Sequence, residues 1–271
     1  MLGTAVRGSS PLGGGAARVT LTDGRTVLVK DGEPAAVAAE AAGLRWLRPV
    51  VPVPAVLEVD GGRLVTEFVP SGTPDRDAAA ELGRGLARMH AAGAPAFGAP
   101  PPDGPAAARI GGAPMRNASA PDWPEWYAAD RVLPYLRSAR DAGMLTPGEV
   151  GEIEEVARRL PRLAGPAEPP ARLHGDLWSG NVLWSPTGAV LIDPAAHGGH
   201  RETDLAMLAL FGCPHLDVVL AAYDEAAPLA DGWRDRVPLH QLFPLLVHVV
   251  LFGGGYPAQA VAAARAALRA A

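Results

Sequence analysis

Lysine is almost missing from this chain of 271 residues. Of its 24 basic residues 23 are arginine, and Lys30 is the single lysine. Arginine presents a broad planar fork, whereas lysine presents a compact ammonium group on a slim stem. A composition that favours arginine so strongly, yet keeps one lysine, indicates that position 30 needs a compact cation.

Disulfides, membrane spans and a basic surface are also missing. Cys213 is the only cysteine, which excludes an internal disulfide and favours a buried, inert thiol. The start, MLGTAVRGSS, lacks the apolar core of a signal peptide, and no run approaches the roughly 18 apolar residues of a transmembrane helix. A net charge of −5 without a basic cluster argues against nucleic-acid and acidic-membrane partners. We therefore expect a cytoplasmic protein with neither kind of partner.

The clearest pattern that is present runs from His174 to Asp193, HGDLWSGNVLWSPTGAVLID. In protein-kinase catalytic loops an Asp accepts the proton of the substrate hydroxyl, and an Asn five residues later holds Mg²⁺. Asp176 and Asn181 have this interval. An apolar run over 189–192 predicts a short buried strand that delivers Asp193 as a second metal ligand. Each residue alone is typical of a turn, but all of them in register predict phosphoryl transfer with ATP and Mg²⁺.

The amino-terminal part supplies matching features. Lys30 ends a predicted strand over 25–30, in which Leu28 and Lys30 share one face, as in the kinase strand whose lysine holds the α- and β-phosphates. A predicted helix over 35–47 carries Glu40, the expected ion-pair partner of Lys30. Upstream, a glycine-rich turn between two strands allows backbone amides to approach phosphates closely. That turn consists of Gly13, Gly14 and Gly15.

Two lobes are predicted. Strands over 53–59 and 63–69 form a hairpin, and Pro70-Ser71-Gly72 then breaks the pattern. We expect residues 1–70 to form an ATP-binding lobe that ends in a hinge at 67–72, and residues 73–271 to form a catalytic and substrate-binding lobe. An adenine ring at the hinge would meet the carbonyl of Glu67 and the amide of Val69, with Phe68 between them.

The second lobe is predicted to be mainly helical. Helical spacing covers 77–90, and two further helices are expected, one following the aromatic segment 122–127 through Arg137 and one over 147–160. Residues 91–121 are rich in Ala, Gly and Pro and predict a long loop in which no chemistry can be identified. The fold class is therefore α+β, with a small β-rich lobe and a larger helical lobe.

These residues resemble one family closely, the fructosamine and ketosamine kinases, which are relatives of aminoglycoside and choline kinases within the protein-kinase-like fold. The resemblance covers nearly the whole chain. Three features narrow the resemblance to ketosamine kinases: the Trp of HGDLW, DPA in place of DFG, and the following GGHRE. It rests on three segments: HGDLWSGN (174–181), IDPAAHGGHRETDLAMLALFG (192–212) and HQLFPLLVHVVLFGGGY (240–256).

The resemblance implies ATP-dependent phosphorylation of the C3 hydroxyl of ketosamines, the fructosamine-type and ribulosamine-type adducts of glycation. The phosphorylated adduct breaks down, so the family acts in protein deglycation. Carried over by position, Asp176 is the catalytic base, Asn181 and Asp193 bind Mg²⁺, and Lys30 with Glu40 fixes the ATP phosphates. The expected partner is a small-molecule ketoamine or a glycated protein side chain, and we expect a monomer, with a dimer left open.

Several polar and aromatic residues are candidates for the sugar subsite. Trp178, two residues after the base, either lines that subsite or anchors the loop. Asp204 matches a family aspartate that braces the backbone of the catalytic loop. His197 stands where the family pattern has tyrosine and is expected to alter sugar preference or to titrate near neutral pH. The further candidates are His200, Arg201, Glu202 and His248, of which the last also fits a hydrogen-bonded core histidine.

The chain also departs from the family in two further ways. Only about a dozen residues precede the glycine-rich turn, where many members have a helix, so we expect a truncated or misassigned start and a less stable lobe. The turn lacks the cysteine that some relatives use for redox-controlled dimers. Two alternative functions remain open: another small-molecule kinase of this fold, acting on an aminoglycoside, choline or homoserine, and a non-catalytic nucleotide-binding module.

Overall fold

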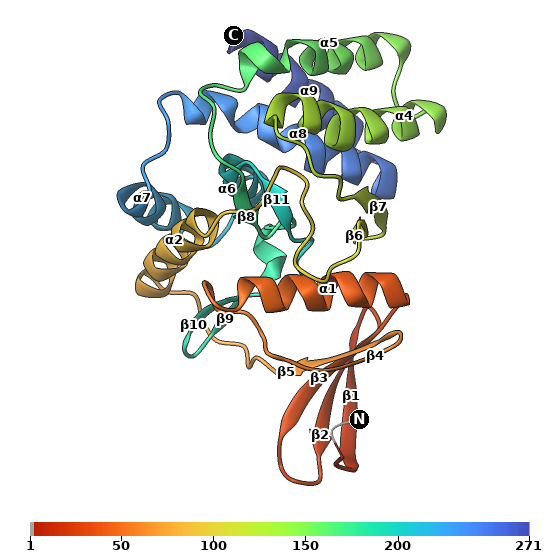
Figure 1. Ribbon diagram of the computed structural model, residues 1–271, viewed down its shortest axis with the longest axis vertical. Coiled ribbons are helices and arrows are strands. Elements are labelled where there is room, and N and C mark those ends of the chain that lie inside the picture. Colours follow the sequence, from red (N-terminus) through yellow and green to blue (C-terminus); the bar gives the residue numbers. More distant parts are fainter. Residues whose placement is uncertain (1–2, 271) are drawn as a thin grey trace.

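A five-stranded antiparallel sheet forms the amino-terminal lobe of the computed structural model, which describes residues 3–270 (Figure 1). One face is closed by Val19, Leu21, Val27 and Val65, whereas the first strand is exposed along its whole length. The predicted glycine-rich turn joins the first two strands. In spatial order the strands are β1 (Val6–Gly13), β2 (Ala16–Leu21), β3 (Thr26–Asp31), β5 (Arg63–Glu67) and β4 (Val56–Asp60).

Helix α1 (Pro34–Leu47) lies between this sheet and the rest of the molecule (Figure 1). Glu33 caps it by accepting hydrogen bonds from the amides of Ala35 and Ala36, both at 3.1 Å, and Pro34 suits the first turn. Its buried residues are apolar and the helix packs against β4 and β5, while its Glu40 lines the cleft between the lobes. The helix predicted over 35–47 is confirmed.

The carboxy-terminal lobe is mainly helical, as expected, and its core lies between the carboxy-terminal helices and the aromatic segment. No helix within residues 3–270 is long and apolar enough to cross a bilayer. Its helices are α2 (Arg76–Ala91), α3 (Trp123–Trp126), a π-helical segment (Tyr127–Val132), α4 (Leu133–Asp141), α5 (Pro147–Leu163), α6 (Arg201–Leu210), α7 (Leu216–Ala226), α8 (Trp233–Phe252) and α9 (Tyr256–Arg269).

The remaining strands form three short antiparallel pairs. One of these pairs corrects the prediction of a long loop over residues 91–121. Residues 91–121 are not a featureless loop, because they contain the hairpin β6–β7 around a Gly111-Gly112 turn. Residues 68–75, by contrast, form neither helix nor strand, and the hinge at 67–72 stays a prediction. The pairs are β6 (Ala107–Ile110) with β7 (Ala113–Arg116), β8 (Ala171–Leu173) with β11 (His197–Gly199), and β9 (Val182–Ser185) with β10 (Gly188–Leu191).

Candidate active site

The backbone of the catalytic loop is held by Asp204 of α6. Its carboxylate accepts hydrogen bonds from the amides of His174 at 2.7 Å and Gly175 at 2.9 Å. Gly175 has φ +82°, and a Cβ there would lie 2.1 Å from the Ala195 carbonyl oxygen, so only glycine fits this turn. Burial would raise the pKa of Asp204, but the hydrogen bond from His90, the nearby His90 and His174 rings and the Gly175 amide together outweigh it and lower that pKa. The bracing role expected for Asp204 is confirmed.

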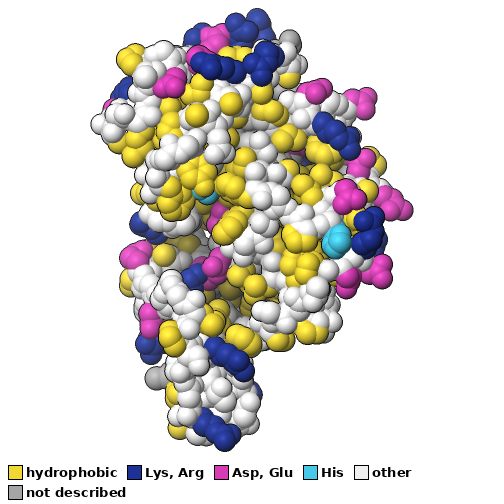
Figure 2. All heavy atoms as spheres, turned by 180° about the vertical axis from the view of Figure 1, so that it is seen from behind, with side chains coloured by type: hydrophobic (Ala, Val, Ile, Leu, Met, Phe, Trp, Pro, Cys, Tyr) yellow, Lys and Arg dark blue, Asp and Glu magenta, His cyan; other side chains and the backbone are white. Residues whose placement is uncertain are grey.

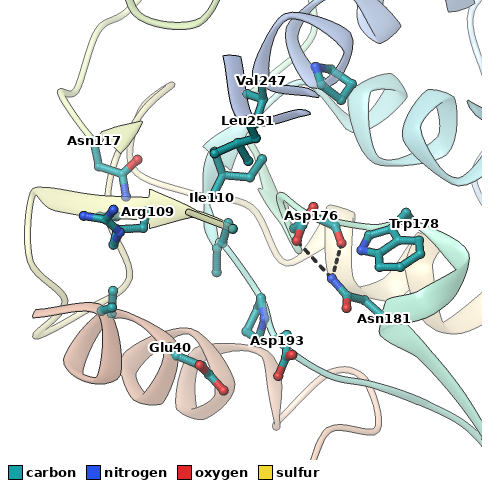
Figure 3. Close-up of a pocket in the computed structure, with 18 of the residues that line it drawn as sticks. Glu40, Arg109, Ile110, Asn117, Asp176, Trp178, Asn181, Asp193, Val247 and Leu251 are labelled. Carbon is teal, nitrogen blue, oxygen red and sulfur yellow. Dashed lines mark hydrogen bonds between the residues drawn. The ribbon is translucent and has the colours of Figure 1, made fainter. Parts of the chain in front are cut away.

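Asp176 and Asn181 are joined directly. The Asn181 amide nitrogen donates to the Asp176 carboxylate at 3.0 Å and to its backbone carbonyl at 2.8 Å (Figure 3). A turn of 3₁₀ helix, Ser179–Asn181, brings the two side chains together. Burial raises the pKa of Asp176 to about 6, although the Asn181 hydrogen bond opposes this. Asp176 is thus a carboxylate that is ionised at neutral pH and is poised to accept a proton.

Lys30 bridges two carboxylates from different parts of the chain. Its ammonium group lies 2.8 Å from Glu40 of α1 and 3.1 Å from Asp193, which follows β10. Burial would lower the pKa of Lys30, but these two carboxylates outweigh it and raise that pKa, so the ammonium stays charged. Asp193 adopts a left-handed backbone with φ +52°, a conformation that aspartate tolerates better than most residues. The ion pair expected between Lys30 and Glu40 is present.

A cavity of about 400 Å³ opens on the side of Lys30 that faces the sheet. Gly13 of the glycine-rich turn lines it, whereas Gly14 and Gly15 do not, although all three have positive φ. Leu28 and Lys30 point into it together, as the strand alternation predicts. Its outer wall is the segment Glu67–Val69, and its floor is Leu183 and Ile192. The lining combines apolar residues with the charged Lys30, Glu40 and Asp193, which suits a nucleotide.

A second cavity, of about 340 Å³, opens on the other side of the same residues. Lys30, Glu40 and Asp193 line both cavities, whereas Asp176 lines only the second. Figure 2 shows the hollow between the lobes with hydrophobic side chains around it and acidic ones within it. The second cavity is also lined by residues from the 91–121 region and from α8, namely Pro101, Pro105, Ala108, Arg109, Ile110, Gly111, Asn117, Pro244, Val247, His248, Leu251 and Phe252.

We name this second cavity the acceptor cleft. An aromatic cluster borders it. Trp178 packs edge-on against Phe211 with 6.3 Å between ring centroids, and Phe211 in turn contacts His248. Trp178 is 39% exposed and lines the cleft, while Phe252 is 65% exposed at its border. The predicted positions of Trp178 and His248 at this site agree with the structure, and His248 also makes a hydrogen bond to the Pro244 carbonyl at 2.7 Å.

Three residues predicted for the substrate subsite lie elsewhere. His197 is buried in β11, where its Nδ1 contacts the Ala195 carbonyl oxygen, and burial lowers its pKa to about 3, so the expected titration near neutral pH is wrong. Arg201 forms an ion pair with Glu168 at 2.7 Å. Glu202 receives two hydrogen bonds from Arg236, at 2.6 and 2.9 Å. None of the three lines the acceptor cleft.

His200 is also buried away from the cleft, as the side-chain cap of α6. The sequence analysis in turn missed Arg109, Asn117 and the apolar residues of α8. The alternation around Gly111-Gly112 is a hairpin signal that would have indicated the strands carrying Arg109 and preceding Asn117. Cys213 is half-buried, and burial raises the pKa of its thiol to about 11, in line with an inert cysteine.

The donor set near Asp193 suits Mg²⁺. Asn181 uses its amide nitrogen to bind Asp176, which turns its amide oxygen toward other partners, and Asp193 has 45% of its side chain exposed beside Lys30. Magnesium prefers oxygen ligands and commonly keeps several waters beside one or two carboxylates. The oxygen atoms of Asn181 and Asp193 therefore fit the ion, and both residues line the acceptor cleft.

Two solved structures resemble this chain over nearly its whole length. A crystal structure from Thermobifida fusca, of a protein assigned as a fructosamine-3-kinase, is 51% identical and has a TM-score of 0.94, covering 99% of this chain and 96% of that one. A choline kinase from Streptococcus pneumoniae has a TM-score of 0.63 at 14% identity, over 97% of this chain and 94% of that one. The second comparison concerns the fold alone, and it confirms the protein-kinase-like fold.

Sequence comparison gives the family. A probable ketoamine kinase of Thermus thermophilus is 33% identical over 250 residues, which is 91% of this chain and 88% of that protein. One from Enterococcus faecium is 35% identical over 230 residues, 82% of this chain and 79% of that protein. The sequence pattern of the fructosamine kinase family matches residues 5–270. The chain therefore belongs to the fructosamine kinase family.

Proposed function

We propose that this protein transfers the γ-phosphate of ATP to the C3 hydroxyl of ketosamines, the fructosamine-type and ribulosamine-type products of glycation. One observation carries the proposal. The two cavities meet at Lys30, Glu40 and Asp193, and Asp176 faces only the acceptor side. A phosphoryl group that crosses this junction passes from a nucleotide site to a hydroxyl held against a base.

Each residue at the junction has a separate task. The Asp176 carboxylate accepts the proton of the attacking hydroxyl, and Asn181 keeps it oriented through its 3.0 Å hydrogen bond. Lys30, fixed by Glu40, holds the phosphates toward the junction, and its positive charge offsets their negative charge. Asp204 prevents the loop that carries Asp176 from shifting. In-line transfer depends mainly on such positioning.

The nucleotide site would place adenine between the Glu67–Val69 segment and the floor residues Leu183 and Ile192. The backbone of Glu67 and Val69 would supply the acceptor and the donor for its edge, with Phe68 between them. Gly13 would lie over the phosphates. Asn181 and Asp193 would hold Mg²⁺, which when bound would supply positive charge to offset the charge developing on the phosphates.

The relatives extend the proposal to the acceptor. A plant relative from Arabidopsis thaliana is named a protein-ribulosamine 3-kinase and is 34% identical over 211 residues, which is 76% of this chain and 61% of that protein. We therefore infer that ribulosamines and fructosamines are the acceptors and that the reaction serves deglycation. Trp178 would form one wall of the sugar subsite, since a flat indole covers sugar carbons well.

The test is ³¹P NMR of the product formed from ribuloselysine, ATP and Mg²⁺, with Asp176→Ala as the variant. A sugar 3-phosphate signal is expected from the wild type, and turnover by the variant should fall at least about 100-fold, because positioned proton transfer contributes roughly 10²–10⁴-fold. Asp217→Ala, at an exposed aspartate of α7, is the matched control and should keep full activity.

Two outcomes would contradict the proposal. If turnover falls less than about tenfold in Asp176→Ala, Asp176 is not the base. Turnover of choline or an aminoglycoside, with no turnover of ribuloselysine or fructoselysine, would show another small-molecule kinase of the same fold.

A further inference from the structure

A buried arginine without a carboxylate partner lies behind the acceptor cleft. Arg131, in the π-helical segment, is 0% exposed. Its guanidinium donates to the carbonyl oxygens of Arg116 at 2.7 Å and Asp130 at 3.3 Å, and it lies over the ring of Trp126. Within residues 3–270 no carboxylate oxygen lies within 4.0 Å of it, because the Asp130 carboxylate pairs with Arg116 instead.

This arrangement is energetically unusual. A buried charge normally has a partner of opposite charge, because desolvation of an unpaired ion is costly. Burial lowers the pKa of Arg131 to about 10, which still leaves it charged at neutral pH. Backbone carbonyls and a π-face offset part of the cost. The remaining positive charge makes its surroundings attractive to an anion.

Asn117 connects this charge to the cleft. Its side-chain oxygen accepts a hydrogen bond from Arg131 at 3.0 Å. Arginine has donors only, so this contact fixes the amide with its oxygen toward Arg131 and its NH₂ group away from it. That NH₂ group has no hydrogen-bond partner, although Asn117 is only 4% exposed and lines the acceptor cleft. A buried donor without a partner is rare in folded proteins, and an acceptor group bound in the cleft would satisfy it.

A second cation lies on the same wall. Arg109 of β6 lines the cleft too, and within residues 3–270 its guanidinium donates one hydrogen bond, to the Gly112 carbonyl, which leaves most of its N–H groups available. Figure 3 shows Asn117 and Arg109 on the side of the cleft opposite Asp176. The cleft is therefore acidic at the junction of the two cavities and cationic at its far wall.

We propose that Asn117 and Arg109 form a carboxylate subsite for the acceptor, supported from behind by the charge of Arg131. The proposal rests on the proposed function. The Asn117 NH₂ group donates to one carboxylate oxygen, and the Arg109 guanidinium pairs with the carboxylate from the mouth of the cleft. Asp176, Glu40 and Asp193 repel the same group, so the acceptor enters with its hydroxyl toward Asp176 and its carboxylate toward Asn117.

The subsite distinguishes two classes of ketosamine. A glycated free amino acid carries an α-carboxylate. A glycated lysine within a polypeptide has no such charge, because its carboxyl group is part of a peptide bond. The subsite therefore assigns free glycated amino acids as the preferred acceptors, over glycated proteins.

The test compares two acceptors that differ only in this group, N-(1-deoxyfructosyl)-valine and N-(1-deoxyfructosyl)-isobutylamine, which is the same compound without its carboxyl group. Wild-type kcat/KM should favour the first at least about tenfold, the usual worth of a hydrogen bond to a charged group. Isothermal titration of both compounds without ATP measures the same preference in binding, independently of turnover.

Asn117→Asp is the decisive variant, because it keeps the side-chain shape, gives Arg131 a carboxylate partner and repels the acceptor carboxylate. Its melting temperature should equal or exceed that of the wild type, while the preference falls below about twofold. Arg109→Gln should reduce the preference about threefold without changing stability.

The outcomes separate the two proposals. Equal affinity of the wild type for both compounds overturns the subsite, and so does an Asn117→Asp variant that keeps the preference. A variant that loses both acceptors equally shows a structural role for Asn117 and also overturns it. Absence of phosphorylation with either acceptor contradicts the proposed function, and the titration then still decides the subsite.

Discussion

The two cavities that meet at Lys30 are built in different ways. The nucleotide side is bounded by adjacent strands, and its charged groups lie where it meets the other cavity, with the Lys30 ammonium 2.8 Å from Glu40 and 3.1 Å from Asp193. The acceptor side combines a hairpin, the catalytic loop and α8, with mostly aliphatic and aromatic walls. The fixed charges therefore serve the ATP phosphates, which take part in every turnover. The acceptor site is shaped by segments that are far apart in the sequence.

The largest expected loss comes from the nucleotide side. Lys30→Ala removes the one cation that lines both cavities among the described residues. The kcat/KM for ATP should therefore fall about 10²–10³-fold, the typical effect of losing one charge-stabilising group. The KM of the acceptor should stay within about twofold. Steady-state kinetics with each substrate varied in turn will measure both.

The matched control is Arg25→Ala, a cation just before the same strand that pairs with the exposed Asp23. It should leave both parameters unchanged. If kcat/KM for ATP falls less than about fivefold in Lys30→Ala, the phosphates are held elsewhere. Lys30 would then not separate the nucleotide side from the acceptor side.

The sequence predicted the residues around the junction of the two cavities well, because short, local rules set their positions. Strand alternation placed Leu28 and Lys30 on one face, and the predicted helix together with the kinase ion-pair pattern put Glu40 opposite Lys30. The five-residue interval between Asp176 and Asn181 spans a single turn. Each of these distances in space is set by a few residues along the chain.

The acceptor side was predicted less well, because its walls meet only through long-range packing. GGHRE looked like a pocket motif, yet Arg201 and Glu202 begin a buried helix and pair with Glu168 and Arg236. No periodicity reports which side of α8 faces a cleft when the helix is apolar nearly all round. The sequence indicated a position for Trp178 near the acceptor only because this residue lies two positions after Asp176.

Glu202 tests whether this motif serves the scaffold or the acceptor. Its charge pairs with Arg236, whose side chain is 10% exposed, so Glu202→Gln should cost about 3 kcal/mol of unfolding free energy, the lower end for breaking a buried pair. The KM of the acceptor should not change. Urea denaturation and acceptor titration, both well below the melting temperature, will measure the two effects.

Glu152→Gln is the control, because Glu152 pairs with Arg265 at the surface and its loss should leave the free energy of unfolding nearly unchanged. A large rise in acceptor KM with unchanged stability in Glu202→Gln would place the motif on the acceptor side after all.

The pH dependence should follow Asp176. Burial raises its pKa to about 6, and the base must be ionised to accept a proton. Activity should therefore be flat above this pH and fall about tenfold for each unit below it, seen in kcat/KM of the acceptor. Asn181 lowers this pKa through its hydrogen bond, so Asn181→Ala should move the midpoint upward. A midpoint that stays in place would show that another group controls the profile.

The smallest expected effect tests the aromatic border of the acceptor cleft. Trp178→Ala removes a ring that is 39% exposed and lines this cleft but not the nucleotide cavity. Acceptor KM should rise about fivefold through lost apolar contact, whereas the KM of ATP stays within about twofold. Trp178→Phe keeps a ring and should recover most of the affinity. If both substrates weaken equally, Trp178 acts by anchoring the catalytic loop, and the division between the two cavities does not extend to this residue.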